Sequence, residues 1–204
     1  GKLNMSFHGY SNHHSIHGNT ITDWKGGYIG DYEGKLDYIW ANPPYGLKDY
    51  GIAYAETAQG KENRWEYGVP KKGEGEYAFL ESIVNLLNEN GKAVAILPLG
   101  TLFKDSTKDI RSRWIEEDIV EGIINLPSAM FFTTGIPVCM WIINKNKKEH
   151  NVHLSDQDKS YRSRDGEVLF MDLRRKGSEF EKKYTNAWIK LIKEDSTIDL
   201  MNLE

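Results

Sequence analysis

The sequence predicts an α/β domain built on a doubly wound, mostly parallel sheet. Apolar segments of strand length alternate with segments whose apolar residues recur at helical spacing, an order typical of a parallel sheet with crossover helices. A chain of 204 residues is also long enough to bury one core of this kind. We therefore expect residues 1–204 to belong to a single domain.

Two helices are expected in the middle of the chain. From Glu76 onward apolar residues recur at helical spacing, and Asn90-Gly91 is typical of a helix end. Ser106, with Asp109 three residues later, predicts a capped helix that runs to about Asp118. These helices are expected to bury Phe79, Leu80, Ile83, Val84, Leu86, Leu87, Ile110, Trp114 and Ile115.

Strands are expected on either side of these helices. Their apolar runs cover residues 36–41, 92–99, 121–126, 138–143 and 167–173. An amphipathic helix beginning at Ser178 follows the last of them, so residues 167–195 are expected to form a strand and a helix. The polar stretch from Lys145 to Gly166 is expected to be a surface connection.

The most informative segment is Asn42-Pro43-Pro44-Tyr45. It follows an expected buried strand from Leu36 to Ala41, which two consecutive prolines prevent from continuing. Each proline also removes a backbone N–H, so the local carbonyl groups have few competing donors. An amide side chain and a phenol ring lie beside them. This combination suits a planar NH2 group, such as the amine of a nucleobase.

Composition and charge limit the classes of protein. A net charge of −4 is not typical of an autonomous DNA-binding module, so nucleic acid would have to meet local patches or a partner. The single cysteine, Cys139, lies in an apolar run and argues against a disulfide framework or a cysteine metal site. This use of cysteine indicates a reduced, cytoplasmic setting. We also recognise no signal peptide and no apolar run of membrane-spanning length.

The segment Asn42-Pro43-Pro44-Tyr45 resembles the catalytic motif of amino methyltransferases that use S-adenosylmethionine, chiefly the N6-adenine DNA methyltransferases. The resemblance implies a Rossmann-like methyltransferase fold and methyl transfer to an adenine flipped out of the duplex. It also implies that Asn42 and the Pro43 carbonyl accept the amine hydrogens, while Tyr45 stacks on the base.

Other segments resemble the methylation subunits of type I restriction-modification systems. These are Asn4-Met5-Ser6-Phe7-His8-Gly9, Gly18-Asn19-Thr20, and the run from Leu126-Pro127 through Phe131-Phe132 to Thr134-Gly135-Ile136. The resemblance implies that Phe132 lies against the target base, opposite Tyr45. It implies a cofactor-binding role for Asn19, which stands where the family has an aspartate. It implies three partners: DNA, the specificity subunit and the restriction subunit.

One family feature has no counterpart in this sequence. The glycine-rich loop that holds the methionine part of S-adenosylmethionine in this family is absent, because Gly26, Gly27 and Gly30 follow no apolar strand. We therefore expect a fragment of the catalytic domain that lacks its main cofactor loop and is inactive in isolation.

Residues 46–75 are expected to form a long polar loop. Aromatic and basic residues are interleaved in it, and we expect it to close over DNA beside the flipped base. Acidic residues are as numerous as basic ones in this stretch, so a disordered surface insertion is the alternative. The residues in question are Tyr50, Tyr54, Trp65 and Tyr67 with Lys48, Lys61, Arg64, Lys71 and Lys72.

Four neighbouring histidines are candidate metal ligands. His8, His13, His14 and His17 are flanked by Ser, Asn and Gly, which indicates a loop and favours a polar surface segment over a metal site.

Three other functions stay open from the sequence. Protein N5-glutamine methyltransferases also use Asn-Pro-Pro-Tyr, on a primary amide. An inert assembly fragment that docks on the specificity subunit is a second alternative. A nicotinamide-binding domain has the same type of sheet, but its glycine fingerprint is missing.

Overall fold

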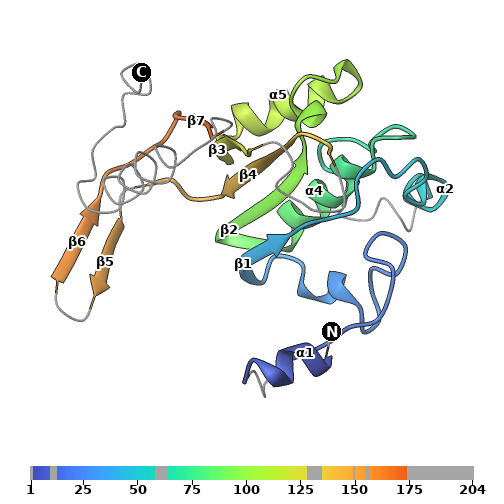
Figure 1. Ribbon diagram of the computed structural model, residues 1–204, viewed down its shortest axis with the longest axis horizontal. Helices are drawn as coiled ribbons and strands as arrows, with labels where there is room; N and C mark the ends of the chain where they lie inside the picture. The colour runs from blue at the N-terminus through green and yellow to red at the C-terminus, as the bar shows by residue number, and fades with distance from the viewer. Residues whose placement is uncertain are drawn as a thin grey trace.

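The computed structural model describes residues 2–9, 13–57, 64–127, 135–148, 150–154 and 157–173. At its centre is a five-stranded sheet in the order β1-β2-β4-β3-β7 (Figure 1). The strands are β1 (Leu36–Ala41), β2 (Leu87–Pro98), β3 (Val120–Asn125), β4 (Val138–Asn144) and β7 (Leu169–Asp172). The pairs β1/β2 and β3/β7 are parallel, and β4 is antiparallel to both of its neighbours. The expected mostly parallel α/β sheet is thus confirmed, with β4 as the reversed strand.

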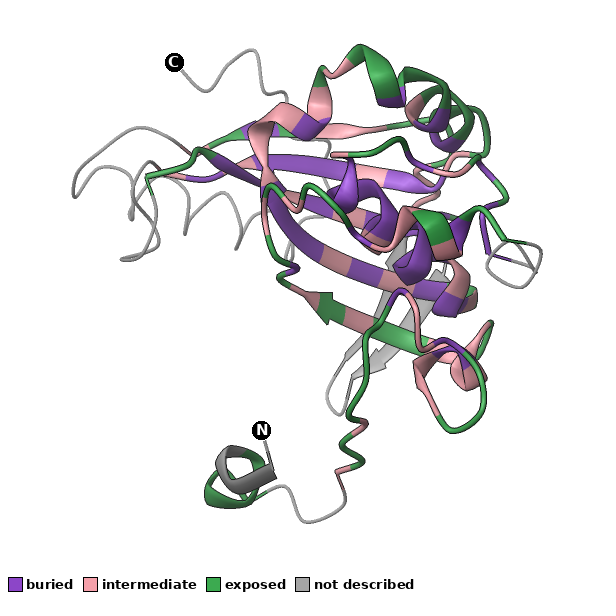
Figure 2. Cartoon of the chain, turned by 90° about the vertical axis from the view of Figure 1, so that its right-hand side faces the viewer, coloured by how far each residue is buried: buried purple, intermediate pink, exposed green. Residues whose placement is uncertain are grey.

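The two main helices, α4 (Gly75–Leu86) and α5 (Lys108–Glu116), share one core with the sheet. Side chains alternate between the faces of each strand: Ala95 and Leu97 of β2 belong to this helix-facing core, whereas Ile96 belongs to a cluster on the other face. Figure 2 shows the buried residues concentrated where the helices meet the sheet. The free Cys139, expected in an apolar run, is buried in β4.

Helix α4 ends four residues before the position that the sequence predicts. Its last residue is Leu86, and β2 begins at Leu87, so Asn90-Gly91 lies within the strand. The reason is tertiary, because the carbonyls of Asn85 and Leu86 accept hydrogen bonds from the N–H groups of Gly34 and Lys35, just before β1.

The start of helix α5 also differs from the prediction. A short 3₁₀ helix, η3 (Asp105–Thr107), precedes it, and Ser106 does not cap it; the Ser106 hydroxyl lies 2.7 Å from Glu74 Oε1 instead. Ile110 and Trp114 are buried as expected, but the expectation for Ile115 is wrong because its side chain is 52% exposed.

Strand β1 is less buried than its apolar sequence indicates. It lies at one end of the strand order, where Tyr38 and Trp40 are 79% and 71% exposed. Ile39 and Ala41, on the opposite face, pack against the helix-facing core. The strand itself is therefore confirmed, while its complete burial is not.

The stretch from Gly46 to Gly75 is a packed segment rather than an open loop where the structure describes it. It contains the short helix α2 (Ile52–Ala55), and Tyr50, Trp65 and Tyr67 are buried. Tyr50 and Trp65 form a second core cluster with Ile21 and Ala78. Because buried rings cannot stack on bases, the expectation that these three aromatic residues contact DNA is wrong.

The remaining elements are peripheral. They are α1 (Lys2–Phe7), the 3₁₀ helices η1 (Ile29–Tyr32) and η2 (Leu99–Leu102), and an antiparallel pair formed by β5 (His150–Leu154) and β6 (Gln157–Tyr161). This pair replaces the plain surface connection expected up to Gly166. The helix expected from Ser178 lies outside the described residues. No helix in the described ranges has the length and apolar character needed to cross a membrane.

Candidate active site

The segment Asn42-Pro43-Pro44-Tyr45 leaves the sheet at the carboxyl end of β1. In open α/β sheets this is the end at which ligands bind. Asn42 is exposed, whereas Pro43 is buried, so the first proline anchors the segment while the amide faces outward. The sequence prediction that the chain departs from the sheet at Asn42 is confirmed.

Asn42 and Tyr45 lie in direct contact. The Tyr45 hydroxyl donates a hydrogen bond of 2.6 Å to Asn42 Oδ1, closing a small ring across the two prolines. Burial, followed by the influence of Cys139, raises the pKa of Tyr45, so this hydroxyl stays protonated and remains a donor near neutral pH. The amide oxygen has two lone pairs, and one of them stays available for a second donor.

The Tyr45 ring rests on the sheet face opposite α4 and α5. It packs against a cluster formed by Ile96, Ile124, Leu126, Val138 and Met171. Phe132, the other expected stacking residue, lies outside the described residues. The residues that bracket its segment are described: Leu126 donates a backbone hydrogen bond of 3.1 Å to the Val138 carbonyl. Leu126 and Val138, which precede and follow that segment in the sequence, both belong to the cluster beneath Tyr45.

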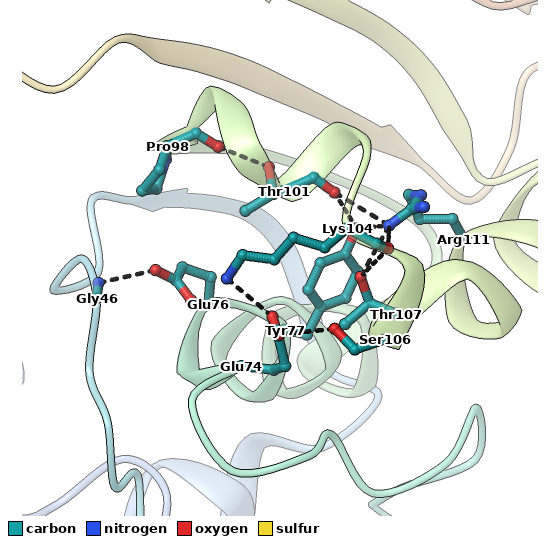
Figure 3. Close-up of polar contacts among 10 residues, drawn as sticks. All are labelled: Gly46, Glu74, Glu76, Tyr77, Pro98, Thr101, Lys104, Ser106, Thr107 and Arg111. Carbon is teal, nitrogen blue, oxygen red and sulfur yellow. Dashed lines mark hydrogen bonds and ion pairs between the residues drawn. The ribbon is translucent and has the colours of Figure 1, made fainter.

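A carboxylate from α4 holds the other end of the motif. Glu76 Oε1 accepts a hydrogen bond of 2.8 Å from the backbone N–H of Gly46, the residue after Tyr45 (Figure 3). Glu76 is only 3% exposed, and Gly46 has a φ of 65°, a left-handed conformation that favours glycine. No feature of the sequence pointed to Glu76, because Gly46 and Glu76 are separated by 30 residues.

A polar network connects the start of α4 with the segment that follows β2 (Figure 3). Glu74 forms an ion pair of 3.0 Å with Lys104 and accepts the Ser106 hydroxyl. Arg111 of α5 donates to the Lys104 carbonyl at 2.8 Å, and Tyr77 donates to the Thr101 carbonyl at 2.6 Å. These contacts fix the turn after β2 against the helix that carries Glu76.

Asn19, the candidate cofactor residue, organises a turn. Its Oδ1 accepts the backbone N–H groups of Ile21 and Thr22 at 2.9 and 3.2 Å, and its own N–H donates to Asp23 at 2.8 Å. Asn19 and Asp23 also line a pocket of about 220 Å³. This volume is below the roughly 300–1,000 Å³ typical of small-molecule sites. The pocket is therefore too small to enclose the whole of S-adenosylmethionine.

Arg64 joins this turn to α4, a role that the sequence did not suggest. It is 1% exposed, so the expectation that it contacts DNA is wrong. Its guanidinium donates to the carbonyls of Thr20 and Ile21 and, at 3.0 Å, to Ser82 Oγ. It also stacks over Trp24, at 3.9 Å from the ring centroid. The adjacent aromatic residue Trp65 was the feature of the sequence that could have indicated this role, and its ring centroid lies 4.8 Å from the guanidinium.

The candidate histidines do not form a metal site where the structure describes them. His8 and His14 are exposed. Among the residues that the structure describes, no group of three His, Cys, Asp or Glu side chains is arranged to hold a metal ion.

The fold was compared with solved structures. A type I restriction-modification methyltransferase subunit from Streptococcus thermophilus matches with a TM-score of 0.68 and 24% identity, over 97% of this chain and 40% of that one. A putative class I S-adenosylmethionine-dependent methyltransferase from Listeria monocytogenes matches with a TM-score of 0.51 and 16% identity, over 78% and 43% of the two chains. The fold is that of the class I methyltransferases.

The chain also resembles known proteins in sequence. A sequence model of the family described as N-6 DNA Methylase matches residues 1–195, and the chain belongs to this family. The HindI methylase subunit of Haemophilus influenzae is 34% identical over 145 residues, which are 70% of this chain and 28% of that protein. The MjaVII methylase subunit of Methanocaldococcus jannaschii is 29% identical over 194 residues, 89% and 29% of the two chains. The chain thus spans under a third of the length of these relatives.

Proposed function

We propose that this chain supplies the methyl-acceptor side of an S-adenosylmethionine-dependent DNA methyltransferase that modifies adenine at N6 within a type I restriction-modification complex. The observation that carries the proposal is the Asn42–Tyr45 contact at the carboxyl end of β1. Membership of the N-6 DNA Methylase family supports DNA as the substrate, and the relatives are named as methylase subunits of type I restriction enzymes.

Asn42 and Pro43 provide the acceptors for the reacting amine. The second lone pair of Asn42 Oδ1 and the Pro43 carbonyl accept the two hydrogens of the adenine amine, which leaves the nitrogen lone pair free. Pro44 supplies no N–H that would compete for these acceptors. The residues thus orient the amine and stabilise the positive charge that develops on it, without a strong general base.

Tyr45 and Phe132 hold the plane of the base. Tyr45 is backed by the cluster of Ile96, Ile124, Leu126, Val138 and Met171, so its ring has a rigid support. Phe132 is the second proposed stacking residue, and each ring would contribute about 1–3 kcal/mol of stacking.

S-adenosylmethionine supplies the activated methyl group. Within this chain, Asn19 and Asp23 would hold a polar end of the cofactor. We assign no residue of this chain to the methionine end. DNA sequence recognition belongs to the specificity subunit, and DNA cleavage to the restriction subunit.

The test is a chimera in which residues 1–195 replace the homologous part of the Haemophilus influenzae HindI methylase subunit, assembled with that enzyme's specificity subunit. Radiolabelled S-adenosylmethionine is offered with the enzyme's DNA duplex, with the same duplex carrying N6-methyladenine at the target, and with a glutamine peptide. Nucleoside analysis of the labelled duplex identifies the methylated base.

We expect label in N6-methyladenine, with none in the premethylated duplex and at least a hundredfold slower transfer in Asn42→Ala, the loss typical when one positioned transition-state contact is removed. Label in cytosine or in the glutamine peptide would refute adenine as substrate. An inactive chimera beside an active parental subunit would refute the catalytic role and favour an assembly fragment.

A further inference from the structure

We infer that Glu76 is a positioning residue for the Asn42-Pro43-Pro44-Tyr45 segment, acting through the backbone N–H of Gly46. The inference rests on the proposed function, because it assigns a residue of α4 to the same site. It starts from the 2.8 Å hydrogen bond between Glu76 Oε1 and Gly46 N, which joins two segments 30 residues apart (Figure 3).

The segment needs support at this end. Asn42 follows directly on β1, and the ladder with β2 holds the strand up to Ala41. Beyond Ala41 the two prolines cannot donate backbone hydrogen bonds, and the Tyr45 hydroxyl bonds back to Asn42 within the same segment. The first backbone donor after Tyr45 is Gly46, and Glu76 accepts it.

The residues at the start of α4 contact the chain just after the motif at three adjacent positions. Gly73 donates a backbone hydrogen bond of 3.1 Å to the Lys48 carbonyl. A Cβ on Gly75 would lie 3.1 Å from both Cβ and O of Leu47, so the helix start approaches this loop closely. Glu76 adds the third point, at Gly46. Only the third reaches the residue next to Tyr45.

The environment of Glu76 fits a positioning role better than a stabilising one. The side chain is 3% exposed, and its second oxygen, Oε2, has no hydrogen-bond partner within the described part of the chain. Burying a carboxyl group for a single bond to a backbone amide is costly. The benefit of that bond is local, because it holds the left-handed turn at Gly46 and, through it, the Tyr45 ring and the Asn42 amide.

The first experiment uses the 204-residue chain itself and does not require activity. Hydrogen exchange of the Gly46 amide is followed by NMR in the wild type, Glu76→Ala, Glu76→Gln and the matched control Glu74→Gln. We expect Glu76→Ala to accelerate Gly46 exchange about tenfold or more, as when a hydrogen bond to a buried side-chain acceptor is lost, while the two Gln variants keep it protected. Glutamine retains an acceptor oxygen, and Glu74 faces Lys104 and Ser106 instead.

The second experiment places the same Glu76 variants in the chimera with the HindI subunit. We expect Glu76→Ala to lower kcat about tenfold with little change in the KM for DNA, and Glu76→Gln to restore most of kcat. An inactive wild-type chimera would count against the proposed function, while the exchange data would still decide the role of Glu76.

Two results would overturn the inference. The first is equal protection of Gly46 in Glu76→Ala and the wild type. The second is a parallel acceleration of exchange across α4 and β2 in Glu76→Ala, which would show that Glu76 only stabilises the fold.

Discussion

The Tyr45 hydroxyl and Asn42 Oδ1 are joined by a hydrogen bond of 2.6 Å, so the proposed stacking residue also orients the proposed acceptor. The two functions of Tyr45 can be separated by substitution. In the chimera, Tyr45→Phe keeps the ring and loses the hydroxyl, and we expect kcat to fall about five- to tenfold, the equivalent of one neutral hydrogen bond. Tyr45→Ala also loses stacking of about 1–3 kcal/mol and should weaken binding of the target base.

The measurement for Tyr45 is steady-state methylation together with DNA affinity. Equal kcat for Tyr45→Phe and the wild type would show that the Asn42 contact has no catalytic consequence.

Arg64 should be among the most sensitive residues for stability. Its buried guanidinium contacts Thr20, Ile21 and Ser82 and stacks on Trp24. Arg64→Ala leaves those carbonyls unsatisfied, and we expect a loss of about 2–4 kcal/mol in the free energy of unfolding. Arg64→Lys should recover little of it, because an ammonium cannot reproduce the planar fork.

Urea denaturation of the chain measures the effect of Arg64. Lys72→Ala is the matched control, since Lys72 comes from the same 46–75 stretch and is exposed. A similar midpoint for Arg64→Ala and Lys72→Ala would contradict the structural role.

Glu81 should make the stability of the chain depend on pH. It is completely buried in α4, and this burial raises its pKa from the ordinary 4.5 to about 9. Between these two values the folded state keeps a proton that the unfolded state releases. The free energy of unfolding should therefore fall as pH rises from 4.5 towards 9, by up to about 1.4 kcal/mol per pH unit from this group.

Glu81→Gln should remove this part of the slope, because the amide does not titrate. Urea denaturation at several pH values compares it with Glu116→Gln, a change at an exposed position of α5. Identical pH slopes for Glu81→Gln and the wild type would show that Glu81 is ionised in the folded state.

Gly91 distinguishes the strand seen in the structure from the helix end that the sequence predicts. A Cβ at Gly91 would lie 2.8 Å from Leu87 Cβ and 2.9 Å from the Leu36 carbonyl oxygen, inside the β1–β2 contact. We expect Gly91→Ala to cost about 1–3 kcal/mol through overpacking. At Gly100 an added Cβ would meet only Lys104 Cε at 4.0 Å, so Gly100→Ala should be nearly neutral in the same thermal or urea unfolding experiment.

Local patterns in the sequence determined the strands and the position of the motif. Apolar runs placed β3 and β4 to within one residue, and two prolines placed the exit from β1 at Asn42. Asn42 and Tyr45 were predicted together because they belong to one tetrapeptide. Such features depend on the residue period and on the fixed φ of proline, which act within a few residues.

Only the tertiary structure decided the features that depend on distant contacts. Helix α4 ends at Leu86 because Gly34 and Lys35 satisfy its last carbonyls. Arg64 is buried because the turn at Thr20 and Ile21 offers it acceptors more than 40 residues away in sequence. Glu76 contacts Gly46 for the same reason. The chain between them folds back so that its two ends lie side by side, and no local pattern in either segment predicts this contact.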